Sequence, residues 1–196
     1  PPAPEAAFAE TRDLPRHGMA LVVSPANVQK RLFPVMKATD AVPPGEFTVE
    51  AVVSLGSLWP DGTVRTVAAQ WNGDAKRPGW ALGVTGKGSR FTPGTLILQM
   101  TGNDASGQLR SEVVPSDLPV PLNRPWFVSA AFAAGKVTFM VRDLGDVDSA
   151  FQAVTVAVPV VDVGVGAREP VVFGARSDSR RSHAFDGFIG EARLTA

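Results

Sequence analysis

Residues 126–141 read WFVSAAFAAGKVTFMV, and this stretch decides the fold class. Every second residue over 126–132 is apolar, and the same alternation returns over 137–141. A period of two places successive side chains on opposite faces of a β-strand. The Ala-Gly pair at 134–135 is a tight-turn signal between the two runs. The stretch therefore predicts a β-hairpin with one face turned to a core.

The same alternation recurs on both sides of this hairpin. The other alternating segments are 47–53, 64–71, 80–84, 95–100 and 154–158. A helix-like apolar spacing occurs only over 27–36, where Pro34 breaks it. About ten short strands with turns between them predict an all-β protein, a two-sheet antiparallel β-sandwich of the jelly-roll type. We expect an extended tail over 1–18 and one sandwich domain over 19–196.

The charge and cysteine content exclude several classes of protein. Lys plus Arg and Asp plus Glu each number 19, so the formal net charge is zero. A nucleic-acid binder normally carries a basic excess, so we expect no nucleic-acid partner. The chain has no cysteine, which removes disulfides and thiolate chemistry. No apolar run reaches the roughly 18 residues of a membrane span, so we expect no membrane insertion.

The sequence begins Pro-Pro-Ala-Pro, without an initiator Met or a visible signal peptide. We therefore expect a processed piece of a longer protein with neighbouring domains.

Five blocks of sequence, in order over about 47–194, resemble a known family. The quoted blocks are FTVEAVV at 47–53, VAAQW at 67–71, GWALGV at 79–84, the hairpin at 126–141, and the C-terminal block of VFGAR at 172–176 with FDGFIGEARL at 185–194. They are similar to the strands of laminin-G-like jelly rolls. The resemblance implies the concanavalin A-like lectin/glucanase superfamily and an extracytoplasmic, bacterial setting. The chain departs from the family pattern at Phe127, where a histidine is usual, and at Gly190, where an acid is usual.

The sequence does not contain the catalytic residue patterns that the glucanases and lyases of this superfamily use. Its glucanases carry paired carboxylates on one strand, which flank the glycosidic bond. Here Glu50, Glu112 and Glu191 stand alone. Its lyases use a tyrosine, and this chain has none. The sequence favours a non-catalytic protein, with no catalytic residues assigned.

Aromatic and polar residues at the ends of strands are the candidates for ligand binding. Sugars stack on tryptophan, and Asp, Asn or Arg side chains hold their hydroxyls. Trp80 and Trp126 lie in apolar stripes and are expected in the core, whereas Trp59 and Trp71 border turns. The predicted ligand-binding residues are Trp59, Asp61, Arg65, Trp71, Asn72, Asp74 and Arg176.

One loop has the composition of a calcium site. Asp143, Asp146 and Asp148 follow the hairpin closely, and hard cations prefer clustered carboxylates. The alternative is a solvated turn, because Asp and Gly are turn formers.

These observations predict a non-catalytic recognition module of a larger exported bacterial protein, with a glycan or a protein as ligand. Two alternatives stay open. The first is a glycan-active hydrolase or lyase of the same fold, which requires converging acids in a groove. The second is a structural spacer domain, which requires an exposed apolar patch.

Overall fold

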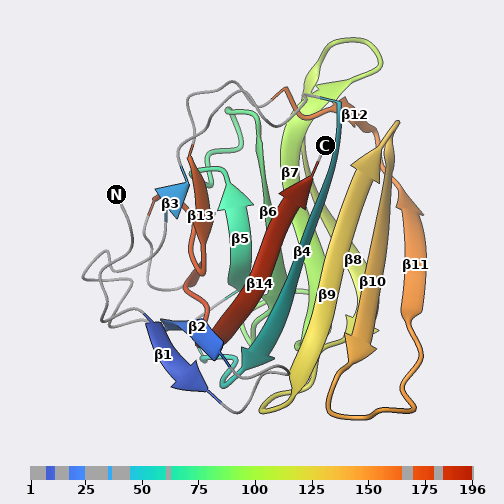
Figure 1. Ribbon diagram of the computed structural model, residues 1–196. Helices are drawn as coiled ribbons and strands as arrows, with labels where there is room; N and C mark the ends of the chain where they lie inside the picture. Colours follow the sequence, from blue (N-terminus) through green and yellow to red (C-terminus); the bar gives the residue numbers. More distant parts are fainter. Residues whose placement is uncertain are drawn as a thin grey trace.

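A computed structural model of the chain describes residues 8–11, 18–24, 35–36, 45–60, 63–164, 170–178 and 183–195. Two antiparallel sheets lie face to face in it (Figure 1). Along the first sheet, in spatial order, lie β1 (Phe8–Thr11), β2 (Gly18–Val23), β14 (Gly187–Thr195), β4 (Glu46–Leu55), β9 (Pro125–Ala133), β10 (Lys136–Asp143) and β11 (Gln152–Ala157).

The second sheet is built around three long neighbouring strands. Its spatial order is β12 (Val160–Asp162), β7 (Thr95–Asp104), β6 (Gly79–Thr85), β5 (Val64–Gln70), β13 (Val171–Phe173) and β3 (Val35–Met36). Strand β8 (Leu109–Pro119) also pairs with β7. The β-sandwich predicted from the sequence is confirmed.

The predicted hairpin is β9 and β10, in the expected register. Lys136 pairs with Ala133, and the ladder continues to Asp143 opposite Trp126. Ala134 and Gly135 have φ values of 46° and 73°. Positive φ at both central residues matches the twist of the two strands, so the turn fixes the register.

Aromatic side chains from both sheets fill the core. Phe47 from the first sheet stacks on Trp80 from the second, with ring centroids 5.0 Å apart. Phe132 packs against Phe47 at 5.7 Å. Trp80 and Trp126 are 0% and 5% exposed, as the sequence predicts for core residues.

Two segments near the start of the chain contain short strands. Strand β1 lies within the segment 1–18, and its four residues pair with β2. The helix-like spacing over 27–36 lies outside the described residues except for Val35 and Met36, which form β3. In the part of the chain that the structure describes, no helix is long and apolar enough to cross a bilayer.

Candidate functional site

The predicted ligand-binding residues fall into two groups, one at each end of β5. Trp59 and Arg65 lie near its start, and Trp71 follows its last residue. At about 3.3 Å per residue, the seven residues of β5 separate the two groups by roughly 20 Å. Asp61 lies outside the described residues. The residues therefore cannot form one compact site.

Trp59 belongs to the first group and is held in an unusual backbone conformation. Its φ is 38°, in the left-handed region that non-glycine residues seldom occupy. The indole Nε1–H donates to Asp186 Oδ2 at 3.0 Å. The hydroxyl of Ser57 donates to the same carboxylate oxygen, and Gly56 N–H donates to the Asp186 carbonyl at 2.7 Å. These bonds fix the direction of the indole ring.

Arg65 supports this group from the interior. It is fully buried, and its Nη1 donates to the carbonyl oxygen of Ala184 at 3.0 Å. Its guanidinium carbon lies 5.7 Å from the centroid of the Trp59 ring, within the range of a cation–π contact. The structure thus brings Trp59 and Arg65 together, with Arg65 inside and Trp59 partly exposed.

A pocket of about 400 Å³ opens beside Trp59, and we call it the Trp59 pocket. Four connecting segments contribute to it, one from each of the loops β4–β5, β6–β7, β8–β9 and β13–β14. The lining residues are Ser57, Leu58, Trp59, Pro60, Lys87, Leu122 and Asp186. The lining combines an aromatic ring, aliphatic groups, one ammonium group and one carboxylate, which is the composition of a small-molecule site.

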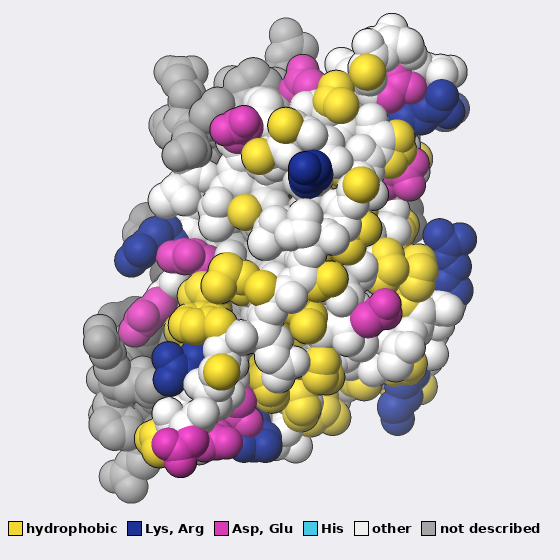
Figure 2. All heavy atoms as spheres, turned by 90° about the vertical axis from the view of Figure 1, so that its right-hand side faces the viewer, with side chains coloured by type: hydrophobic (Ala, Val, Ile, Leu, Met, Phe, Trp, Pro, Cys, Tyr) yellow, Lys and Arg dark blue, Asp and Glu magenta, His cyan; other side chains and the backbone are white. Residues whose placement is uncertain are grey.

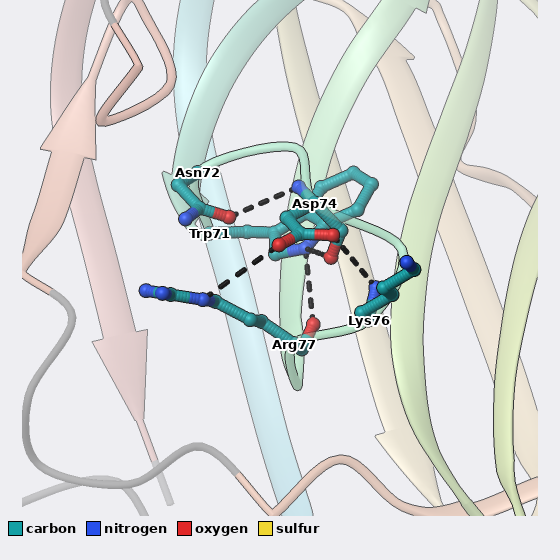
Figure 3. Close-up of polar contacts among 5 residues, drawn as sticks. All are labelled: Trp71, Asn72, Asp74, Lys76 and Arg77. Carbon is teal, nitrogen blue, oxygen red and sulfur yellow. Dashed lines mark hydrogen bonds and ion pairs between the residues drawn. The ribbon is translucent and has the colours of Figure 1, made fainter.

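The second group forms a loop that closes on itself (Figure 3). The Trp71 Nε1–H donates to the carbonyl oxygens of Asp74 and Arg77 at 3.0 and 3.2 Å. Asn72 Oδ1 accepts the Asp74 amide, and Asp74 Oδ1 accepts the Lys76 amide, each at 2.9 Å. Trp71 is 5% exposed, so its ring contributes mainly to packing.

Arg176 lies over this loop. Its guanidinium carbon is 5.7 Å from the centroid of the Trp71 ring, and its Nη2 donates to Asp178 Oδ2 at 2.8 Å. A Cβ added at Gly73 would lie 2.7 Å from the guanidinium carbon, so the glycine leaves room for the arginine. Trp71, Asn72, Asp74 and Arg176 are brought together, and their polar groups bond within the loop 71–77 or, for Arg176, to Asp178.

The acidic loop after β10 uses its carboxylates locally. Asp143 pairs with Arg124 at 2.5 Å and accepts the Gly145 amide at 2.9 Å. Asp146 accepts the amide of Asp148 at 3.1 Å. Among the described residues, no three His, Asp or Glu side chains gather closely enough to hold a metal ion. Calcium binding at Asp143, Asp146 and Asp148 stays a prediction.

A second pocket, of about 300 Å³, was not predicted from the sequence. It lies on the outer face of the second sheet, and we call it the outer-face pocket. Its lining residues are Thr63, Val64, Gly88, Ser89, Arg90, Phe91, Ile97, Gln99 and Val113. The Gly-rich loop 86–94 and its Arg-Phe pair are visible in the sequence, but the position of this loop over the sheet depends on contacts distant in sequence.

No family model matches the chain, and no curated protein matches it. Several solved structures are similar. Tailspike protein 2 of an Escherichia coli O157:H7 bacteriophage aligns with a TM-score of 0.62 and 16% identity, over 90% of this chain and 22% of that chain. The LG1–3 region of the laminin α2 chain gives 0.59 and 9%, over 83% of this chain and 29% of that chain. The fold is laminin-G-like.

A third similar structure is the CBM40 domain of the Ruminococcus gnavus IT-sialidase, solved with α2,3-sialyllactose bound. Its TM-score is 0.54 at 9% identity, over 77% of this chain and 75% of that chain. The chain therefore spans less than a third of the tailspike and laminin chains and three quarters of the CBM40 chain. Identities this low concern the fold, and the five sequence blocks predicted that fold correctly.

Proposed function

We propose that this chain is a non-catalytic glycan-recognition module and that the Trp59 pocket is its binding site. The observation that carries the proposal is the backbone of Trp59, a bulky residue at φ 38°. Residues held in sparsely populated conformations cost free energy and tend to occur at functional sites. Here the residue in this conformation lines a pocket with its indole ring.

The ring is held in place before any ligand arrives. Asp186 accepts the indole N–H at 3.0 Å, and Ser57 in turn fixes the same carboxylate. A side chain that is already ordered loses little conformational entropy on binding. The free protein therefore offers a ready platform for stacking.

The lining of the pocket suits a sugar. The apolar face of a pyranose ring packs on an aromatic face, and Leu58 and Leu122 extend the apolar surface beside Trp59. Lys87 and Ser57 stand at the same pocket and offer hydrogen-bond donors and an acceptor to hydroxyl groups.

The alternative of a glycan-active enzyme has less support at this site. Hydrolysis of a glycoside generally needs two carboxyl groups, separated by about 5–10 Å. Among the described residues that line the Trp59 pocket, Asp186 is the one carboxylate. It is already engaged by the Ser57 hydroxyl and the Trp59 indole.

The similar structures support the proposal that this chain is one part of a longer protein. Two of them are much longer chains, of which this chain matches 22% and 29%. The CBM40 domain, whose structure holds sialyllactose, supports a glycan ligand. We extend the proposal to a module of a larger exported bacterial protein, as expected from the sequence.

The test is a glycan array followed by titration calorimetry on each glycan that binds. Trp59→Ala should lower the affinity about tenfold or more, because a buried aromatic anchor commonly contributes that much. Phe151→Ala is the matched control, since Phe151 is a 51% exposed aromatic residue away from both pockets. Unchanged affinity in the Trp59 variant would place binding elsewhere, and a blank array would contradict the glycan proposal itself.

The array is run with calcium and with a chelator. Binding that needs calcium would support the predicted site at Asp143, Asp146 and Asp148, and the Asp146→Asn variant should then lose the dependence. Binding that persists in the presence of the chelator would support glycan recognition that does not depend on calcium.

A structural spacer is the second candidate function, and one surface favours it. Figure 2 looks at the side of the molecule where β10 and β11 lie, and hydrophobic side chains gather over its lower half. Val147 and Phe151 are 88% and 51% exposed. Phe151 meets Phe127 edge-on at 5.6 Å. A blank glycan array, together with stabilisation of the domain by an adjoining domain of its natural protein, would favour this candidate.

A further inference from the structure

The outer-face pocket and the Trp59 pocket are neighbours on one loop. Lys87 lines the Trp59 pocket, and the next residue, Gly88, lines the outer-face pocket. Consecutive Cα atoms are about 3.8 Å apart, so the two pockets flank the same short piece of backbone. A ligand that occupies both pockets has to cross the β6–β7 loop.

This loop is held in a defined shape. Gly86 N–H donates to the Thr63 carbonyl and Gly94 N–H to the Thr85 carbonyl, each at 2.9 Å. The hydroxyl of Thr85 donates to the Thr92 carbonyl at 2.6 Å. The Phe91 amide donates to Ser89 Oγ at 3.1 Å. Fixed loops keep binding groups in position at low entropic cost.

The floor of the outer-face pocket contains an unused acceptor. Gln99 lines the pocket, and its Oε1 is buried without a hydrogen-bond partner within the described parts of the chain. A buried acceptor left unsatisfied costs free energy. Rotation of the Gln99 side chain, which lines the pocket, would turn this acceptor toward a hydroxyl group of a ligand.

The wall of the pocket carries an aromatic ring and a positive charge side by side. The guanidinium carbon of Arg90 lies 4.9 Å from the centroid of the Phe91 ring. Of the described residues that line this pocket, Arg90 is the one that is ionised. A guanidinium group pairs with carboxylate or sulfate oxygens in a two-pronged geometry.

We infer that the outer-face pocket binds an anionic sugar unit, so that the ligand is an acidic oligosaccharide spanning both pockets. The inference rests on the proposed glycan function and names its ligand class. Trp59 and Lys87 receive one unit, and Phe91, Arg90 and Gln99 receive the next. Each pocket combines an aromatic surface with a cation, and their volumes lie at the small end for ligand sites.

The experiment measures binding to uronate-, sialate- and sulfate-bearing oligosaccharides and to their neutral counterparts of the same length, from one to six units. The wild-type chain should prefer the acidic members, and affinity should rise between one unit and two or three. Arg90→Gln should weaken binding of acidic oligosaccharides about tenfold, the value of one charged hydrogen bond, and leave neutral ones unchanged. Raising the salt concentration should weaken only the acidic series.

Gln99→Met is a second variant that keeps the volume of the side chain and removes its acceptor. It should weaken both series to the same degree. Arg77→Gln is the charge control, because Arg77 is an exposed arginine in the loop at the other end of β5.

The possible outcomes distinguish a failure of this inference from a failure of the proposed function. Binding that is lost in Trp59→Ala but unchanged in Arg90→Gln overturns the inference and leaves the Trp59 pocket in place. Preference for neutral glycans overturns it likewise. Absence of binding to every glycan overturns the proposed function, and the inference with it.

Discussion

The outer faces of the two sheets differ, although both sheets are built from alternating sequences. On β10 of the first sheet, outward residues such as Thr138, Met140 and Arg142 are half-exposed between fully buried neighbours. On β6 of the second sheet, every residue is buried. An antiparallel sheet with one solvated face normally alternates, so complete burial shows that the outer face of the second sheet is also packed.

Small residues and loops explain this second packed face. Ala69 and Ala81 pair across β5 and β6 and pack with Trp71 from the following loop. A Cβ added at Gly79 would lie 2.5 Å from Trp71 Cδ1. Small side chains on this face let loops approach the sheet, and the same approach creates the outer-face pocket. The outer face of the second sheet therefore differs from that of the first in its packing and in carrying the outer-face pocket.

The largest effect is expected at Gly83, in the middle of this face. Gly83→Ala would place a Cβ 2.5 Å from Val64 Cγ1 and 2.6 Å from the Arg65 carbonyl oxygen. The backbone oxygen cannot move aside, so the free energy of unfolding should fall by about 3 kcal/mol. Urea unfolding measures it. Gly45→Ala is the control, because no atom of the described residues lies within 4 Å of the added Cβ. Equal effects at the two positions would contradict the contrast between a packed and an open surface.

A smaller effect is expected at Arg176, beside the same face. Its side chain is 6% exposed and that of Asp178 is 17% exposed. Arg176→Met should lower the free energy of unfolding by about 2 kcal/mol, since it removes the ion pair between Arg176 and the partly buried Asp178 carboxylate. The double variant with Asp178→Asn should recover part of the loss. Reduced glycan affinity with unchanged stability would instead make Arg176 the ligand-binding residue that the sequence predicts.

The smallest effect is expected on the first sheet, at the turn between β9 and β10. Ala134 has φ 46°, a conformation that glycine adopts without the penalty of a Cβ. Ala134→Gly should raise the free energy of unfolding by about 0.5 kcal/mol, measured by thermal and urea unfolding. Gly135→Ala, at φ 73°, should lower it. A loss of stability in Ala134→Gly would show that the turn tolerates its strain through contacts of the alanine methyl.

The strands that alternate cleanly could be predicted from sequence, and β8 could not. The segment 126–141 has a single solvated face, so its period is visible in the residues. Strand β8 contains Pro115 and Pro119 and several charged residues. Such residues are typical of an edge strand, where backbone groups on one side need no partner, and they conceal the alternation.

The candidate site was only partly predictable for a related reason. Trp59 and Trp71 both border turns, and the sequence does not distinguish them. The difference lies in where the indole N–H donates: to a carboxylate 127 residues away for Trp59, and to carbonyls within six residues for Trp71. The outer-face pocket likewise joins Arg90 to residues of β5 and β8, and such distant contacts leave no local pattern.

The place of β14 between β2 and β4 has a consequence for biosynthesis. β14 begins at residue 187 and β4 at residue 46, so 141 residues separate the starts of two paired strands. At about 5–20 residues per second, a ribosome needs about 7–28 s to cover that interval. During this time one edge of β4 is open in the nascent chain, and translation speed and chaperone access at this stage should govern the yield of folded protein.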